Sequence, residues 1–364
     1  MGHQAVEGTA VYIHVPFCSI RCDYCAFATW TDRDSLMGAY VAALREEIAT
    51  AVDSAMEPAS SVFFGGGTPS RLAPEAIQSV LGSLGLREGA EVTMEANPED
   101  VNQASLARWR EAGVTRLSIG VQSLDPTVLA SLGRHQDAAQ SLEAAWAVAG
   151  AGFDTWSADL VFGARAETMQ SWETTLGTIL ELDPPHLSCY SLMVEPGTPL
   201  QADLARHPDN DLQAELYEAT EEILAGSGLS WYEVSNWAIP DAHCRHNLSF
   251  WKGGDYRGFG CAAHSRAGER RWWNLRTPER YIEAVSQGRD PMAAEEFLDP
   301  TQRCLEALMG AIRTREGIPW DPGRPVPARL SELVVQEAGR LHLNLGGRLL
   351  ANEVTEELSG ALCG

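Results

Sequence analysis

The stretch HVPFCSIRCDYCAFATW, residues 14–30, places Cys18, Cys22 and Cys25 in a C-x3-C-x2-C array. A structural zinc site uses four ligands and a disulfide uses two, so three closely spaced thiols need another explanation. Thiolates hold iron–sulfur clusters, and three of them leave one iron of a [4Fe–4S] cluster free for a further ligand. A zinc site completed by His14 is the weaker alternative, because zinc sites usually pair their cysteines as C-x2–4-C knuckles.

Apolar segments follow this array and alternate with amphipathic ones. Segments rich in Val, Ile, Leu and Phe predict strands at 10–17, 60–67, 91–98, 116–123, 156–163 and 186–194. Helical periodicity or helix-terminus signals predict helices at 34–53, 74–84 and 137–152. Six β–α units in succession indicate a parallel sheet with crossover helices.

Polar and glycine-rich residues follow the predicted strands throughout the repeat. They are the cysteine array, GGGTPS from 65, EANPED from 95, QSLD from 122 and DLVFG from 159. A parallel barrel collects functional residues at the carboxyl ends of its strands, whereas a doubly wound sheet concentrates them at one switch point. The sequence therefore predicts an α/β fold with a partial (β/α)6 barrel.

The residue composition and the pattern of predicted elements change twice after the predicted barrel. We assign residues 1–228 to the barrel, 229–290 to an extension of it rich in aromatic residues and histidine, and 291–364 to a small helical, winged-helix-like C-terminal domain. In this last part the pattern predicts a helix at 299–314, a second helix at 327–339, a short strand, a glycine turn at 346–347 and a final helix.

The bulk composition narrows the classes of partner and location. A net charge of −23 repels phosphate backbones, so nucleic acid is not an expected partner. The first residues do not resemble a signal peptide, and no run of about 18 apolar residues occurs. We therefore expect a cytoplasmic protein. In that reducing compartment most of the other cysteines would be small buried apolar residues rather than disulfide partners: Cys189, Cys244, Cys261, Cys304 and Cys363.

The cysteine array, with Tyr24 directly before its third cysteine, resembles that of the radical S-adenosylmethionine (SAM) superfamily. The resemblance implies that the amino and carboxylate groups of SAM bind the open iron of a [4Fe–4S] cluster. It also implies that the reduced cluster cleaves SAM to a 5′-deoxyadenosyl radical. The protein would then supply mainly binding and orientation.

The same resemblance extends to a set of SAM-binding positions. The glycine-rich segment FFGGGTPS matches the one that binds the methionyl amino group. Of the other positions, Glu95, Gln122 and Asp159 lie at strand ends, and Arg134 lies in LGRHQ. The implied residues are Tyr24, Gly66, Gly67, Thr68, Glu95, Gln122, Arg134, Asp159 and Met193. Tyr12 either stacks near SAM or belongs to the strand core. From the residues alone, Arg134 could be an ordinary solvated charge, whereas carboxylates such as Glu95 at an apolar strand end are costly unless paired.

Segments along nearly the whole chain resemble the oxygen-independent coproporphyrinogen III oxidase family. They include YIHVPFC, RLSIGVQS, HLSCYSLMVEPGTPL, YEVSNWA and GFGCAAHS. That family holds a porphyrinogen decarboxylase and a heme chaperone. The decarboxylase pattern has a fourth cysteine where this chain has Phe27, and it has a longer N-terminal extension before the first cluster cysteine. Both differences favour the chaperone.

The segment HNLSFW, residues 246–251, resembles the HNxxYW heme-binding motif of the chaperone, with phenylalanine in place of tyrosine. The implied heme-binding residues are His246, Asn247, Phe250 and Trp251. The lost hydroxyl puts any role for that group in doubt. Without the resemblance, a core histidine in an aromatic cluster is the simpler interpretation. His243, His264 and Cys244 are rival heme ligands.

The preferred functional hypothesis is a heme chaperone. It would carry heme as cargo to apo-hemoproteins such as respiratory cytochromes, with a [4Fe–4S] cluster and SAM as cofactors. The alternative is oxidative decarboxylation of coproporphyrinogen III, and no catalytic residue is assigned. A radical enzyme acting on nucleic acid is disfavoured by the charge. The sequence is compatible with homodimer formation and with peripheral membrane contact.

Overall fold

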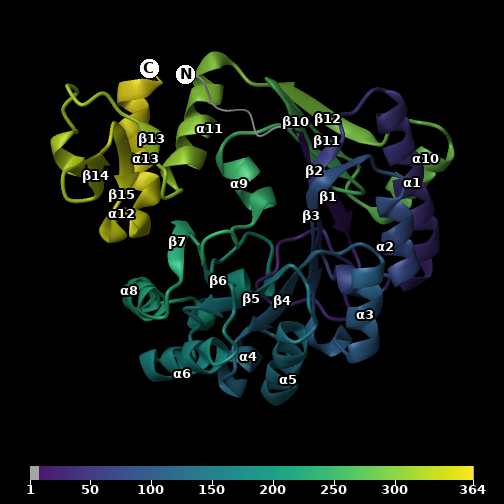
Figure 1. Cartoon of the computed structure of the whole chain (residues 1–364), viewed down its shortest axis with the longest axis horizontal. Helices are drawn as coiled ribbons and strands as arrows, with labels where there is room; N and C mark the ends of the chain where they lie inside the picture. The colour runs from purple at the N-terminus through teal and green to yellow at the C-terminus, as the bar shows by residue number, and fades with distance from the viewer. Residues whose placement is uncertain (1–7, 364) are drawn as a thin grey trace.

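The computed structural model describes residues 8–363. A large curved sheet forms the body of the molecule (Figure 1). Its strands are β1 Thr9–Val15, β2 Ala59–Gly66, β3 Leu86–Ala96, β4 Arg116–Gln122, β5 Thr155–Phe162, β6 His186–Ser191, β7 Ser230–Glu233, β8 Asn236–Ala238, β9 Tyr256–Phe259, β10 His264–Ala267, β11 Arg270–Asn274 and β12 Met292–Phe297. A small second sheet holds β13 Ile318–Pro319, β14 Val334–Glu337 and β15 Arg340–Leu343.

The helices follow the strands in alternation through the first half of the chain. They are α1 Met37–Asp53, α2 Pro74–Leu81, α3 Gln103–Glu111, α4 Pro126–Ser131, α5 Ala138–Ala149, α6 Met169–Leu180, α7 Pro199–Ala202, α8 Asn210–Gly226, α9 Arg245–Trp251, α10 Pro278–Ser286, α11 Pro300–Ile312, α12 Leu345–Leu349 and α13 Ala351–Leu362. Several begin at side-chain caps, and Asn102, Thr168 and Asp299 each form a capping box.

The sheet order is β12-β11-β10-β9-β1-β2-β3-β4-β5-β6-β8-β7. Strands β1 to β6 run parallel to one another, and helices line the convex outer side (Figure 1). At one edge β8 and β7 are antiparallel, while at the other β9 is parallel to β1 and β10 to β12 continue as an antiparallel extension. The predicted α/β partial barrel of six units is confirmed.

Two apolar cores lie in different parts of the chain. Alternate residues of β1, Val11, Ile13 and Val15, are fully buried beneath the helices and belong to the main core. A separate core joins α11, the small sheet and α13. Strand β12 falls within the predicted C-terminal domain, yet it pairs with β11 of the large sheet. The separate core therefore contains residues that follow β12.

The tail differs from the prediction at two points. The prediction of a helix at 327–339 is wrong, because the chain forms a short 3-10 turn and then strand β14. Strand β14 pairs with β15 through a turn at Ala338 and Gly339. Both turn residues have positive φ, at 49° and 74°, as a two-residue hairpin requires. The predicted glycine turn is also wrong, because Gly346 and Gly347 lie inside α12. A side chain on Gly347 would collide with the carbonyl of Leu333.

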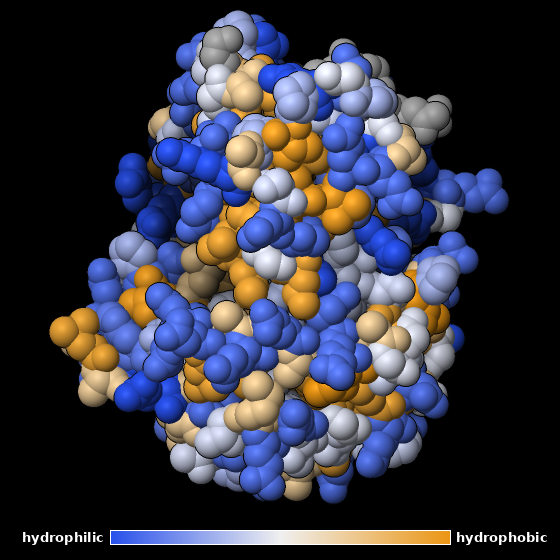
Figure 2. Space-filling view, turned by 90° about the vertical axis from the view of Figure 1, so that its left-hand side faces the viewer, coloured by the Kyte–Doolittle hydropathy of each residue, from blue (hydrophilic) through white to orange (hydrophobic). Residues whose placement is uncertain are grey.

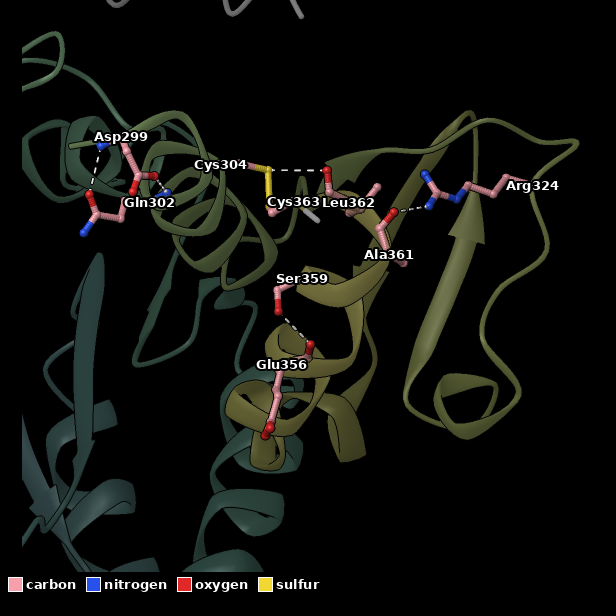
Figure 3. Close-up of a disulfide and its surroundings, with 9 residues drawn as sticks. All are labelled: Asp299, Gln302, Cys304, Arg324, Glu356, Ser359, Ala361, Leu362 and Cys363. Carbon is pink, nitrogen blue, oxygen red and sulfur yellow. Dashed lines mark hydrogen bonds between the residues drawn. A yellow bond between two sulfur atoms is a disulfide. The ribbon is translucent and has the colours of Figure 1, made fainter.

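A disulfide joins Cys304 of α11 to Cys363 just after α13 (Figure 3). The expectation of reduced cysteines is therefore wrong for these two. The topology explains why, since α11 and α13 are neighbours in the small core although 59 residues separate the two cysteines. Cys189, Cys244 and Cys261 are free and buried, as predicted.

The molecular surface reflects the strongly charged composition. In the face shown in Figure 2, hydrophilic residues dominate, and apolar residues gather in a band across the middle. Within residues 8–363 no helix is both long and apolar enough to cross a membrane.

Candidate functional site

A cavity of about 1000 Å³ opens at the carboxyl ends of the barrel strands. Its walls bring together most of the residues that the sequence analysis selected from separate β–α units. The selected residues that line it are Cys18, Cys22, Tyr24, Cys25, Gly66, Gly67, Thr68, Glu95, Gln122, Arg134, Asp159 and Met193. Tyr12 is not among the described residues that line this cavity.

The loop after β1 carries the three cysteines on a fixed backbone. The N–H of Cys18 donates to the carbonyl of Trp30 at 3.0 Å, and the N–H of Trp30 donates to the carbonyl of Pro16 at 2.8 Å. The N–H of Cys25 donates to the carbonyl of Cys22 at 3.1 Å, which turns the chain tightly between these two thiols. All three thiols are free and face the same cavity.

The environment of the thiols suits a bound metal cluster. Burial raises the pKa of Cys18, Cys22 and Cys25, so each thiol stays protonated at neutral pH in the protein alone. A metal centre reverses this effect, because it stabilises the coordinating thiolate. Thr68 donates a hydrogen bond to Cys18 Sγ at 3.6 Å and orients that sulfur. Three thiols and open cavity space beside them fit a cluster that keeps one iron for another ligand.

The zinc alternative has no fourth ligand in His14. Its Nε2 lies 2.9 Å from the carbonyl of Ala28, and its Nδ1 lies 3.2 Å from the hydroxyl of Tyr12. Both ring nitrogens are therefore engaged away from the cysteines. Among the described residues, no group of three His, Cys, Asp or Glu side chains is placed to hold a single metal ion.

The glycine-rich segment allows two strands to approach each other closely. Gly66 has a φ of 108°, and a Cβ at Gly67 would lie 2.7 Å from the carbonyl oxygen of Val15. The N–H of Gly67 instead donates to that oxygen at 2.7 Å. The sequence analysis assigned these glycines to SAM. The structure gives them a second task, which is to hold the cysteine loop against β2.

Two carboxylates at strand ends face the cavity. Burial and the nearby charge of Asp159 raise the pKa of Glu95 to about 8, although the N–H of Gly66 donates to Glu95 Oε2 at 3.2 Å. Burial also raises the pKa of Asp159, which accepts hydrogen bonds from Ser118 at 2.7 Å and Ser157 at 3.0 Å. This pair of acids is ready to accept hydrogen bonds from ligand hydroxyl or ammonium groups.

Arg134 is a half-buried cation that lines the same cavity. Burial lowers its pKa, but the surrounding Tyr24, Cys22 and Glu99 outweigh that effect and raise it. Its guanidinium lies 3.4 Å from the Tyr24 hydroxyl, and its Nε has no hydrogen-bond partner among the described residues. No described carboxylate forms an ion pair with it. An unpaired guanidinium fits the carboxylate of an amino-acid ligand, and together with Glu95 and Asp159 it gives the cavity the polarity that SAM needs.

The remaining selected residues differ in position. Gln122 is buried with a φ of 68°, and a Cβ on Gly120 would lie 2.7 Å from its amide nitrogen, so glycine is required beside it. Met193 stands at the cavity rim with 67% of its surface exposed, and Phe27 at the rim is 65% exposed. Tyr12 lies inside the barrel and stacks on Phe63.

Ser118 and Asn97 are among the polar residues of the cavity lining that the sequence analysis did not select. Ser118 holds Asp159, and Asn97 donates to Thr68 at 3.3 Å and lies 3.5 Å from Arg134. The signal for Ser118 was present, because Ser118, Gly120 and Gln122 alternate along β4 and share one face. Asn97 directly follows β3, where polar residues gather in a barrel.

The HNLSFW motif lies on helix α9, which packs against β1 and β2. Its residues are not among those that line the described cavity. His246 is 3% exposed, its ring contacts Phe63 and Phe250, and its Nδ1 lies 3.1 Å from Ser61 Oγ. Burial lowers its pKa to about 3, and its buried Nε2 has no partner among the described residues. A neutral imidazole with one free nitrogen is the form that binds heme iron.

Asn247 and Trp251 are half-buried on α9 and Phe250 is 39% exposed. The three rival heme ligands lie outside the HNLSFW motif. His243 stacks on Tyr232, and His264 is exposed beside Trp273. Cys244 is the buried residue at the start of α9.

Comparisons with known proteins show the family to which the chain belongs. The model of the Radical SAM superfamily matches residues 12–179. The heme chaperone HemW of Mycobacterium tuberculosis is 36% identical over 96% of this chain and 94% of its own. HemW of Bacillus subtilis is 31% identical over 97% and 100%, and HemW of Escherichia coli is 34% identical over 85% and 84%.

Among solved structures, coproporphyrinogen III oxidase from Escherichia coli matches with a TM-score of 0.82 at 20% identity, over 98% of this chain and 91% of its own. At this identity the match shows a shared fold. The sequence relatives are closer and extend over most of both chains. The chain therefore belongs to the radical SAM superfamily and, within it, to the family of the heme chaperone HemW.

Proposed function

We propose that this protein is a heme chaperone that binds heme and transfers it to apo-hemoproteins, with a [4Fe–4S] cluster and SAM as cofactors. The observation that carries the proposal is the 36% identity to a HemW over 94% of that relative's length. The cavity supports it, because it combines three free thiols with a guanidinium that has no ion-pair partner and two half-buried carboxyl groups.

In this proposal Cys18, Cys22 and Cys25 hold the cluster. Arg134 pairs with the carboxylate of SAM, and Glu95 and Asp159 accept hydrogen bonds from its hydroxyl and ammonium groups. Gly66, Gly67, Thr68 and Gln122 shape the wall beside it, while Tyr24 and Met193 contact it from the cysteine loop and the rim. When bound, the cluster and SAM would supply one-electron chemistry.

Helix α9 would bind the heme. His246 supplies the axial nitrogen, and Asn247, Phe250 and Trp251 flank it on the same helix. The buried Nε2 of His246 must become accessible for this, so α9 has to shift away from β2 when heme binds. Changing His246 to Ala should abolish stable heme binding and leave the cluster absorbance intact. His264→Ala, which changes an exposed rival ligand on β10, should retain heme binding, and heme binding by His246→Ala equal to that of the wild type would refute His246 as the ligand.

The alternative function is decarboxylation of coproporphyrinogen III. One observation bears on it directly: Phe27 stands exposed at the cavity rim where the decarboxylase pattern has a fourth cysteine. The test is an anaerobic assay of reconstituted protein with reductant, SAM and coproporphyrinogen III. We expect no protoporphyrinogen from protein with an intact cluster. Turnover would make the protein a decarboxylase and overturn the chaperone assignment.

We further propose a cytoplasmic location, and acceptors among apo-hemoproteins such as respiratory cytochromes. A membrane-bound acceptor would bring the protein into peripheral contact with a bilayer, and a homodimer is compatible with the large surface outside the cavity. Heme-loaded protein mixed with an apo-cytochrome should lose heme absorbance as the acceptor gains it. If the protein binds heme but does not transfer it, the proposed role in heme delivery would be refuted, and heme storage would remain.

A further inference from the structure

A line of hydrogen bonds crosses the barrel interior from the cavity to the start of helix α9. Ser157 Oγ donates to Asp159 Oδ1 at 3.0 Å, and His186 Nδ1 lies 2.8 Å from Ser157 Oγ. On the other side of the ring, His186 Nε2 lies 2.8 Å from the Tyr232 hydroxyl. The backbone N–H of Cys244, the residue that precedes α9, donates to the same hydroxyl at 3.2 Å. Ser157, His186, Tyr232 and Cys244 are all buried.

One assignment of the protons gives every donor in the line an acceptor. In this assignment the Tyr232 oxygen accepts from Cys244, and the Tyr232 proton is directed to His186 Nε2, which acts as an acceptor. Burial lowers the pKa of His186 well below its usual range, so the ring is neutral and carries its proton on Nδ1. That proton goes to Ser157, and the Ser157 proton goes to Asp159. With the protons assigned in this way, every donor in the line points from α9 toward the cavity carboxylate.

The N-terminus of α9 relies on this interior for its hydrogen bonds. Cys244 is the N-cap residue, and its side chain does not cap the helix. The N–H of Cys244 uses Tyr232, and the N–H of His246 donates to Glu91 Oε1 at 3.2 Å. A helix of seven residues is not stable by itself, so its position depends on such contacts.

Both carboxylate oxygens of Asp159 already accept a hydrogen bond from a serine of the barrel interior. Ser118 already donates to its Oδ2 at 2.7 Å and Ser157 to its Oδ1. A ligand hydroxyl or ammonium group that binds Asp159 has to share these oxygens. Because successive hydrogen bonds in a chain polarise one another, a change at Asp159 alters the bonds of His186 and Tyr232 as well.

We propose that His186 and Tyr232 couple ligand binding at Asp159 to the position of helix α9. They act as positioning residues and touch neither proposed ligand. The inference rests on the proposed function, in which Asp159 contacts SAM and α9 binds heme. It assigns a role to SAM in this protein, namely to change the affinity for heme. By linkage, heme must change the affinity for SAM by the same factor.

The first test uses hydrogen exchange and does not require heme. Cluster-loaded protein is compared with and without saturating SAM, and the backbone amides of residues 244–251 are followed. In the wild type we expect SAM to change their exchange rates about fivefold or more. In Tyr232→Phe the ring can still stack on His243, but the hydroxyl that links His186 to Cys244 is gone. The SAM effect on α9 should disappear.

Two further variants separate the proposed coupling from a local packing defect. Ser157→Ala interrupts the line on a different strand, so agreement with Tyr232→Phe excludes a local packing defect. Tyr217→Phe is the matched control, because its buried hydroxyl donates to the carbonyl of Val234 at 2.9 Å outside the line. It should retain the full SAM effect. The coupling is overturned if SAM leaves the exchange rates of α9 unchanged in the wild type. It is also overturned if SAM changes them equally in the wild type and in Tyr232→Phe.

The second test measures the consequence for heme. The Kd for heme is determined with and without SAM, and the Kd for SAM with and without heme. We expect the two ratios to agree in the wild type, at about fivefold or more, and to approach one in Tyr232→Phe. A protein that binds no heme would refute the proposed function, yet the exchange experiment would still decide the coupling. Heme affinity that is independent of SAM would overturn the regulatory role.

Discussion

At the scale of single residues, Glu95 lies where it can bind a ligand, and its ionisation there lowers the stability of the folded protein. Its pKa of about 8 in the folded protein compares with about 4.3 in an unfolded chain. Between these values the folded state holds the proton that the unfolded state has lost. The contribution of Glu95 to stability is therefore fully present below about pH 4 and is lost as the pH rises through 8.

Changing Glu95 to Gln should remove this pH dependence, because the amide does not ionise. Without cluster or SAM, the loss of unfolding free energy between pH 5 and pH 8 should shrink by ~1 kcal/mol or more, since one pKa unit is worth about 1.4 kcal/mol. Urea unfolding at the two pH values measures it. Glu99→Gln, at the exposed rim, should leave the difference unchanged. An equal effect of both changes would mean that Glu95 is not the group responsible.

Arg134 represents the opposite charge in the same cavity. If it pairs with the carboxylate of SAM, Arg134→Gln should weaken SAM binding about 10- to 100-fold, which corresponds to one charge-assisted hydrogen-bonded pair. Calorimetry on cluster-loaded protein measures the Kd. Arg108→Gln is the control, since Arg108 pairs with Glu75 on the surface. Unchanged affinity in Arg134→Gln would assign the ligand carboxylate to another partner.

At the scale of elements, the loop after β1 should behave as one cluster-binding unit. Changing any of Cys18, Cys22 or Cys25 to Ser should abolish the broad iron–sulfur absorbance of reconstituted protein, because a cubane held by two thiolates loses a ligand it needs. Cys189→Ala should retain that absorbance, since Cys189 is buried in the core on β6, and should cost about 1 kcal/mol of stability. Loss of the cluster in Cys189→Ala would show that another thiol ligates it.

The elements also show what the sequence could and could not predict. Strands β1 to β6 were predictable because each is a short apolar run ending in polar or glycine-rich residues. Strand β14 was not, because helix-compatible residues precede Val334 and Val335, and pairing with β15 decided the structure. Of the cavity residues, Glu95 and Asp159 could be selected because they lie at strand ends, whereas Arg134 and Met193 were selected through the family resemblance. The hydrogen-bond line through His186 and Tyr232 could not be predicted, since no spacing connects residues that only the closed barrel brings together.

At the scale of the whole molecule, Arg348 joins the small C-terminal core to the barrel. Its side chain is 6% exposed, pairs with Glu221 of α8 at 2.7 Å and lies over the rings of Trp231 and Tyr217. On the same side, α11 touches α9 closely, since a Cβ on Gly310 would lie 2.5 Å from the carbonyl oxygen of Trp251. The C-terminal core therefore covers the helix that carries the heme motif.

Arg348→Met should loosen this cover. Breaking a mostly buried ion pair and its ring contacts should cost about 2–3 kcal/mol, whereas Arg329→Met, which removes an exposed pair with Glu357, should cost under about 1 kcal/mol. Urea unfolding compares the two variants, and hydrogen exchange reports on residues 245–251. We expect faster exchange of α9 in Arg348→Met alone, since α11 would then lie less firmly against it. Equal stability losses and an unchanged α9 would mean that the C-terminal core docks without Arg348 and that the heme motif is shielded by the barrel itself.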